Sequence, residues 1–101
     1  MFKQVRQKKL FELEVTDIFN FQDGRTLFSG KLVEEIKTVP KCRATILIDR
    51  KVFKIISIEG VWRPAGKEIE NPLLRTVSTT EEINKSELPY EQGRVILTGY
   101  V

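Results

Sequence analysis

The sequence predicts a small all-β protein: a closed or partly open barrel of six or seven short strands with at most one short helix. Three observations predict it. Apolar and polar residues alternate along several segments, turn-forming residues recur about every 8–12 residues, and the 101 residues suffice for one domain, residues 1–101. A barrel is favoured over a sandwich because strands that run to both ends of a small domain gain most by removing sheet edges.

The longest alternating segment, residues 10–33, predicts a β-hairpin. In its first half the odd-numbered positions are apolar except for Asp17, which predicts a strand with one buried face. The apolar odd-numbered positions are Phe11, Leu13, Val15, Phe19 and Phe21. Asp23 and Gly24 supply the turn, since glycine accepts a positive φ. Gly30 lies inside the returning strand, where glycine indicates a bulge or a close backbone approach.

The middle of the chain predicts a second hairpin. Residues 35–41 form a connection, because Pro40 is incompatible with a central strand. Residues 42–48 alternate and predict a strand with one buried face, and residues 49–51 make a tight reversal. Residues 52–59 are apolar at both odd and even positions, which is typical of a strand buried between two layers.

The last third of the chain carries one strand on each side of a possible helix. Residues 61–71 are rich in turn signals, and residues 73–78 predict a short strand. Thr79 and Glu82 have the spacing of a capping box, which predicts one or two helical turns. Residues 93–101 predict a closing strand that pairs inside the sheet.

The charge of +3 is unevenly distributed. Residues 1–54 hold 12 Lys and Arg against 7 Asp and Glu, a balance of +5, and residues 55–101 hold 5 against 7, a balance of −2. This asymmetry permits an anionic partner, but it falls short of the dense basic face of a dedicated nucleic-acid binder.

Several classes of protein are disfavoured by composition. Cys42 is the only cysteine, so no internal disulfide forms, and we expect it to be a small buried apolar residue. With one Cys and no His, a four-ligand zinc site is excluded, and the commonest general base is missing. No run of about 18 apolar residues and no apolar N-terminal segment occurs, so we expect a cytoplasmic protein without a membrane helix.

Asp17 is a carboxylate within the apolar register and has two interpretations. A buried Asp17 needs donors, which the turn amides near Gly24 or the Arg25 guanidinium could supply. Alternatively, a bulge shifts the register and turns Asp17 outward.

A basic cluster and one tryptophan are the other candidate sites. Four basic residues surround Phe53, and beside Arg25 they would make a weakly positive rim with an aromatic platform for RNA; they are Arg43, Arg50, Lys51 and Lys54. A solvated face is the alternative. Trp62 follows a strand end and is either a core residue or a binding anchor on a loop.

The chain resembles the second, β-barrel domain of elongation factor Tu-type translation GTPases. Residues 11–19 (FELEVTDIF) are similar to the family's first strand, which ends apolar-Val-Glu-Asp-Val-Phe. Residues 24–30 (GRTLFSG) are similar to its Gly-Arg-Gly-Thr-Val-Val-Thr-Gly segment. Residues 53–62 (FKIISIEGVW) and 91–100 (EQGRVILTGY) are similar to two later strands, in the same order.

The resemblance implies a free-standing Greek-key barrel of about six strands. In the family this domain packs against a GTPase domain and holds the aminoacyl end of transfer RNA, or contacts ribosomal RNA. Carried over to this chain, Asp17 matches the family's acid and Phe21 matches the apolar residue that follows its Phe.

The leading functional hypothesis is a non-catalytic module, without cofactor or metal, that binds RNA, a ribonucleoprotein or a protein partner. The candidate ligand-binding residues are Asp17, Phe21, Arg25 and Trp62. One alternative is a protein–protein adaptor that uses Trp62 and an insertion at residues 63–88, with residues 61–88 as the partner surface. Another is a small-molecule-binding or enzymatic barrel that acts through Asp17 and Arg25.

Overall fold

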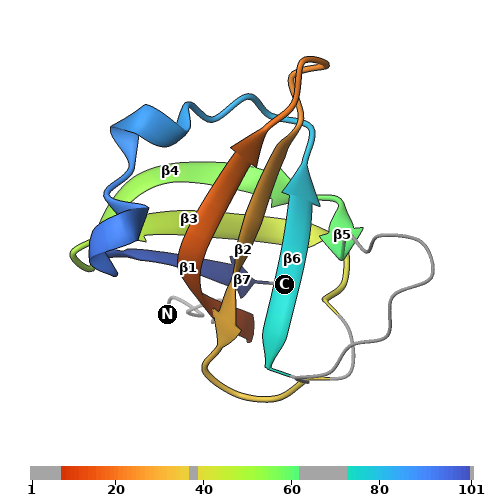
Figure 1. The fold of residues 1–101 in the computed structure, drawn as a ribbon. Coiled ribbons are helices and arrows are strands. Elements are labelled where there is room, and N and C mark those ends of the chain that lie inside the picture. The colour runs from red at the N-terminus through yellow and green to blue at the C-terminus, as the bar shows by residue number, and fades with distance from the viewer. Residues whose placement is uncertain (1–7, 37–38, 62–72, 101) are drawn as a thin grey trace, which may run out of the picture.

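Seven antiparallel strands form one sheet in the order β4-β3-β7-β1-β2-β6-β5 (Figure 1). The computed structural model describes residues 8–36, 39–61 and 73–100. The strands are β1 (Lys9–Asn20), β2 (Thr26–Leu32), β3 (Cys42–Ile48), β4 (Lys51–Ile58), β5 (Gly60–Val61), β6 (Leu74–Thr79) and β7 (Val95–Tyr100). In this part of the chain the helical elements are two 3-10 turns, η1 (Lys85–Glu87) and η2 (Tyr90–Gln92). The all-β prediction is confirmed.

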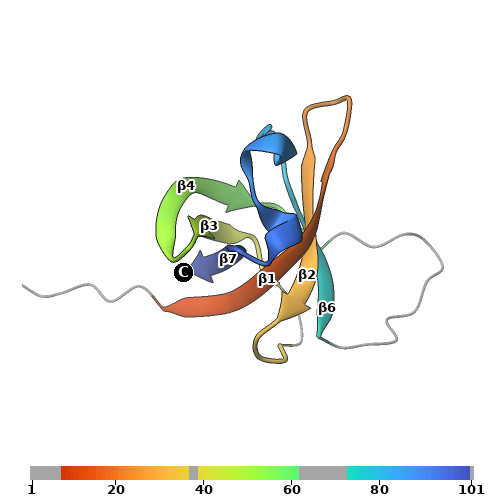
Figure 2. The ribbon, with the colours of Figure 1, turned by 60° about the vertical axis from the view of Figure 1, so that its left-hand side comes forward.

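The sheet curls so that its two ends approach each other (Figure 2). In Figure 1, β3, β4 and β7 run across β1, β2 and β6 as two crossed layers. Only Glu59 separates β4 from β5, and β5 pairs with β6 at the other end of the sheet. The Glu59 amide donates to the Ser78 carbonyl at 2.8 Å. The sheet is therefore a curled half-barrel.

The core lies inside this curl. It is made of buried aliphatic and aromatic side chains from both layers, among them Phe11, Leu13, Val15, Ile18, Phe28, Leu32, Ala44, Ile46, Ile56, Ile58, Val77, Val95 and Leu97. β1 joins the layers, because its first half pairs with β7 and its second half with β2.

A one-residue bulge interrupts β1 where it passes from one layer to the other. Val15 pairs with Gly30 and Asp17 pairs with Ser29, so Thr16 is an extra residue on β1. The strands approach so closely that a Cβ at Gly30 would lie 2.0 Å from the Glu14 carbonyl oxygen. The close approach predicted at Gly30 is confirmed.

The bulge reverses the faces of β1 beyond residue 16, because side chains alternate with a period of two. Ile18 is buried, whereas Phe19 and Phe21 are 48% and 41% exposed. The prediction that both phenylalanines face the core is therefore wrong. Asp17 is exposed, and of its two interpretations the bulge is the one that the structure shows.

The prediction that residues 52–59 are buried on both faces is also wrong. Ile56 and Ile58 are in the core, but Val52 and Ile55 are 65% and 60% exposed. The physical reason is that the curled sheet encloses the core on its inner side, so that only one face of β4 meets the core (Figure 2). An apolar composition alone does not distinguish such a strand from one between two layers.

The predicted capping box at Thr79 does not begin an α-helix. Thr79 is the buried last residue of β6, and its hydroxyl accepts a bond from the Glu81 amide at 3.2 Å. The chain then continues to η1, where the Asn84 side chain is the N-cap. Ile83 and Leu88 are buried, so this segment covers one end of the core.

Candidate binding surfaces

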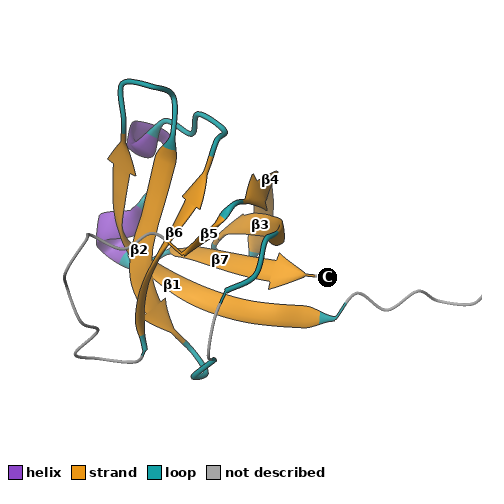
Figure 3. Cartoon of the chain, turned by 90° about the vertical axis from the view of Figure 1, so that its right-hand side faces the viewer, coloured by secondary structure: helices purple, strands orange, loops and turns teal. Residues whose placement is uncertain are grey.

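The outward face of the β1–β2 hairpin brings together three of the four predicted ligand-binding residues. We call Asp17, Phe19, Phe21 and Arg25 the hairpin surface; all four side chains are exposed. In Figure 3 the β1–β2 turn projects at one end of the molecule, next to the 3-10 turns. Because of the Thr16 bulge, residues predicted for the core lie on this accessible face.

The turn fixes the tip of this surface. The Phe21 amide donates to the Arg25 carbonyl at 2.9 Å, and the Gly24 amide donates to the Phe21 carbonyl at 3.1 Å. Gly24 has a φ of 91°, which glycine adopts without a Cβ penalty. The Asp23 carboxylate accepts from the Arg25 amide at 2.9 Å. Asp23 and Gly24 thus make the turn that the sequence predicts.

Arg25 keeps a guanidinium that is available to a ligand. Its ion pair with Asp23 is 3.8 Å long, and both side chains are about half exposed. Exposed pairs of this kind contribute about 0–1 kcal/mol, so an anionic ligand can replace Asp23 at little cost. The buried Asp17–Arg25 arrangement considered from the sequence does not occur.

A row of hydroxyl groups continues the hairpin surface toward β6. The Thr16 hydroxyl lies 3.5 Å from the Asp17 carboxylate and 3.3 Å from the Ser29 carbonyl oxygen. Thr76 on β6 donates to the Ser29 hydroxyl at 3.1 Å. The surface thus changes from polar at Asp17 to aromatic at the tip.

Beneath the tip, Asn20 and Thr26 clamp the hairpin to the chain that precedes η1. Asn20 Nδ2 donates to the Ile83 carbonyl at 2.6 Å, and Asn20 Oδ1 accepts from the Lys85 amide at 3.2 Å. Thr26 Oγ1 accepts from the Ile83 amide and donates to the Glu81 carbonyl, both at 3.0 Å. Sequence reasoning missed both residues, because without the Thr16 bulge the alternation places Asn20 on the outward face, and its partners Ile83 and Lys85 are distant in sequence.

The basic residues predicted for RNA binding do not form a single rim. Arg50 and Lys51 lie in and next to the β3–β4 turn, and Lys54 follows on β4. Arg43 lies at the opposite end of β3, where it pairs in register with Ser57 and Tyr100. Arg25 belongs to the other hairpin, away from the β3–β4 turn (Figure 1). The structure therefore gathers three of the four basic residues.

The β3–β4 turn is a tight reversal, as predicted for residues 49–51, and two residues, Asp49 and Arg50, make it. Asp49 and Arg50 both have positive φ values, 51° and 67°, which is the geometry of a type I′ turn. Arg94 Nε donates to both Asp49 oxygens at 2.8 and 3.0 Å. These bonds from Arg94 hold the pKa of the Asp49 carboxyl below its ordinary value and raise the pKa of Arg94.

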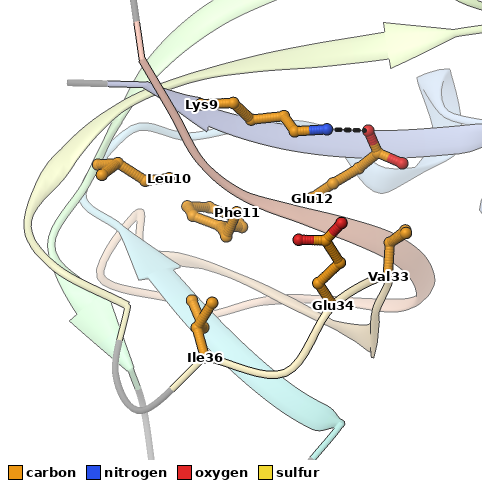
Figure 4. A pocket seen from close by; sticks show the side chains of 7 residues that line it. All are labelled: Lys9, Leu10, Phe11, Glu12, Val33, Glu34 and Ile36. Atoms are coloured by element: carbon orange, nitrogen blue, oxygen red, sulfur yellow. Dashed lines mark hydrogen bonds and ion pairs between the residues drawn. The ribbon is translucent and has the colours of Figure 1, made fainter.

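A hollow between β1 and the end of β2 is too small for a substrate. It has a volume of about 50 Å³ and is lined by Lys9, Leu10, Phe11, Glu12, Val33, Glu34 and Ile36 (Figure 4). Lys9 Nζ lies 3.4 Å from Glu12 Oε1 across its rim. Sites for small molecules measure about 300–1,000 Å³, so this hollow holds little more than water.

The remaining predicted sites are separate from the hairpin surface. Cys42 is half-buried at the start of β3, and burial raises the pKa of its thiol. Trp62 lies outside the described residues. Of the segment 63–88, residues 73–88 are part of the sheet and the core rather than an appended loop.

The described ranges contain neither a metal site nor a membrane helix. No group of three or more Cys, Asp or Glu in these ranges is arranged to hold a metal ion. No helix in the described part of the chain is long and apolar enough to cross a membrane.

Comparison with known proteins returned no match to a family model, to a curated protein or to a solved structure.

Proposed function

We propose that this protein is a non-catalytic, cytoplasmic binding module that takes single-stranded RNA, alone or within a ribonucleoprotein, on its hairpin surface. The observation that carries the proposal is the bulge at Thr16, which turns Phe19 and Phe21 outward beside Arg25. Bulges are frequent next to functional sites because they re-aim side chains.

The chemistry of the hairpin surface suits unpaired bases. Exposed aromatic rings stack on bases with a gain of about 1–3 kcal/mol for each base. Arg25 can bind a phosphate, and the Asp17 carboxylate can accept a hydrogen bond from a ribose 2′-hydroxyl. A projecting hairpin also fits single strands better than a duplex, whose bases are already paired and stacked.

The clamp beneath the surface supports the same function. Because Asn20 and Thr26 bond to residues 81–85, the two rings are carried on a hairpin that is fixed at its base. Less ordering is then needed when a ligand binds, which favours affinity.

The likeness to the translation-factor barrel includes residues of the same surface. In that likeness Asp17 matches the family's acid and Phe21 matches the apolar residue after its Phe, and both side chains are exposed on this hairpin. We therefore propose a Greek-key barrel of the elongation factor Tu domain 2 type that acts as a free-standing RNA-binding module.

Fluorescence anisotropy with a labelled single-stranded RNA of about ten nucleotides tests the proposal. We expect the double variant Phe19→Ala/Phe21→Ala to bind at least about tenfold more weakly, since two stacking contacts are lost. Arg25→Gln should lower the slope of log K against log salt by about 1. The matched control is Leu74→Ala, another exposed apolar residue. Lack of RNA binding at low salt, or equal binding by the double variant, contradicts the proposal.

A further inference from the structure

β4 is the end strand of the sheet, and part of its outer edge has no partner in the described residues. Ser57 and Glu59 turn their amides away from β3: Ser57 N–H donates to Glu81 Oε2 at 2.7 Å, and Glu59 N–H donates to the Ser78 carbonyl. The direction of the backbone groups alternates along a strand, so every second residue points the same way. The amide and carbonyl of Ile55 therefore also point away from β3, toward the open edge. Between Ser57, where Glu81 contacts the edge, and the β3–β4 turn, no strand of the described chain pairs with β4 on this side.

The side chains along this open edge are apolar and exposed. A second bulge brings Val52 onto the same face as Ile55: Ile46 pairs with Lys54 and Leu47 pairs with Val52, so Phe53 is an extra residue. Val52, Phe53 and Ile55 are all exposed, and Val52 and Ile55 are the most exposed of the large apolar side chains described. Natural proteins usually protect such edges with short strands or charges, so an open apolar edge indicates a binding function.

The charge along the edge is positive and largely uncompensated. Arg50, Lys51 and Lys54 form no ion pair with the described residues. The one acidic residue of the hairpin, Asp49, is already bound by Arg94. The edge also accepts a carboxylate in the folded protein, since the Ser57 amide bonds to Glu81.

We propose that β4 binds, by strand addition, an extended peptide in which acidic and apolar side chains alternate. The peptide backbone would pair with the free edge around Ile55, its apolar side chains would cover Val52 and Ile55, and its carboxylates would meet Lys51 and Lys54. This site is separate from the hairpin surface and serves a different class of ligand.

Two other occupants fit the edge less well. A second copy of the chain would bring Arg50, Lys51 and Lys54 against the same residues, and like charges on paired strands destabilise the pairing. RNA could place one base on Phe53, but Val52 and Ile55, the two most exposed of the large apolar side chains described, are aliphatic and offer no second stacking face. The acidic peptide satisfies both the charge and the apolar contacts.

The test uses a labelled 12-residue peptide of alternating Glu and Val and a matched peptide of alternating Lys and Val, titrated into the protein by fluorescence anisotropy. We expect the Glu peptide to bind and the Lys peptide to bind at least about tenfold more weakly. Amide hydrogen exchange at Ile55 should slow when the Glu peptide is bound. Equal binding of the two peptides overturns the proposal.

Variants locate the site. Ile55→Pro removes one outward amide, and proline is tolerated at such an edge position. We expect it to weaken binding of the Glu peptide about tenfold or more. Ile55→Ser, which keeps the amide and adds no charge but removes the apolar contact, should weaken it less, and Leu74→Ser on β6 should leave it unchanged. If thermal unfolding shows that Ile55→Pro is not folded, weaker binding by Ile55→Ser decides in favour of the site. Unchanged binding in both variants, or RNA protecting Ile55 in place of the peptide, overturns the proposal.

Discussion

The β1–β2 and β3–β4 hairpins share one feature, a one-residue bulge, but they differ in how the neighbouring chain covers them. Each carries a one-residue bulge, at Thr16 in β1 and at Phe53 in β4, and each exposes apolar side chains next to it. The β1–β2 hairpin is clamped from beneath by Asn20 and Thr26, and β2 is covered on its other side by β6. The β3–β4 hairpin ends in β4, and within the described ranges no strand pairs with the outer edge of β4 near the β3–β4 turn.

This difference indicates what each hairpin can offer a ligand. In the first hairpin the backbone groups of β1 and β2 pair with neighbouring strands on both sides. A ligand can therefore be recognised only by the side chains of this hairpin. In the second hairpin part of the backbone is free, so a partner can add main-chain hydrogen bonds to apolar contacts. A bulge alone exposes side chains; the neighbouring strands decide whether the backbone is available too.

The largest expected effects compare two adjacent residues that follow each bulge. Ile18→Ala and Ile56→Ala should each lower the free energy of unfolding by about 2–5 kcal/mol, because both side chains are buried. Phe19→Ala and Ile55→Ala should cost at most about 1 kcal/mol. Urea denaturation measures all four. If Phe19→Ala costs as much as Ile18→Ala, the register of β1 described here is wrong.

The next effect concerns the close approach opposite the first bulge. Gly30→Ala should cost about 3 kcal/mol, because its Cβ would overlap the Glu14 carbonyl and the strands would have to separate. At Gly24 a Cβ would meet nothing, so Gly24→Ala should cost about 1 kcal/mol for its positive φ alone. Equal thermal shifts for the two variants would show that the strands are not in close contact at Gly30.

Removal of the clamp should lower the free energy of unfolding by a smaller amount. It should also leave the β1–β2 hairpin, like the β3–β4 hairpin, without this support from beneath. Thr26→Val keeps the shape but leaves the Ile83 amide without its acceptor, which should cost about 1–3 kcal/mol. Hydrogen exchange of the Ile83 amide should accelerate with it. Thr76→Val is the control: it loses one hydroxyl bond and should cost about 1 kcal/mol or less. Unchanged exchange at Ile83 would argue against the clamp.

The smallest effect concerns the turn of the second hairpin. Arg94 lowers the pKa of Asp49 in the folded protein. The pair therefore stabilises the fold fully at pH values above the unfolded pKa of Asp, about 3.9. This stabilisation is lost as the pH falls through the lower pKa that Asp49 has in the folded protein. Asp49→Asn should therefore flatten the decline in Tm between about pH 5 and pH 2. The difference should shrink in 1 M salt. Identical pH profiles would contradict a role for the pair.

Local patterns were sufficient to predict the fold class, the two hairpins and both turns. Both turns depend on the backbone preferences of the turn residues themselves, at Asp23 and Gly24 and at Asp49. The local sequence is therefore enough to predict them. The bulges could not be located in this way, because Thr16 and Phe53 are ordinary strand residues and only the pairing partner shows that they are extra. The predicted faces of Phe19, Phe21 and Val52 were wrong for this reason. Ile55 was assigned to the core because the composition of a strand with one open face can resemble that of a strand between two layers.

The candidate site was predicted in part. Asp17, Phe21 and Arg25 share the hairpin surface, but Phe19 was assigned to the core, and the supporting Asn20 was not identified. Its partners lie more than 60 residues away in sequence, at Ile83 and Lys85, so no local pattern reveals the contact.

The most direct test of the hairpin surface is an NMR titration of the ¹⁵N-labelled protein with a short single-stranded RNA. We expect the largest amide chemical-shift changes at residues 17–27, with β4 little affected, and their loss in Phe19→Ala/Phe21→Ala. Changes confined to the β3–β4 hairpin, or none at low salt, would contradict the assignment of RNA binding to this surface.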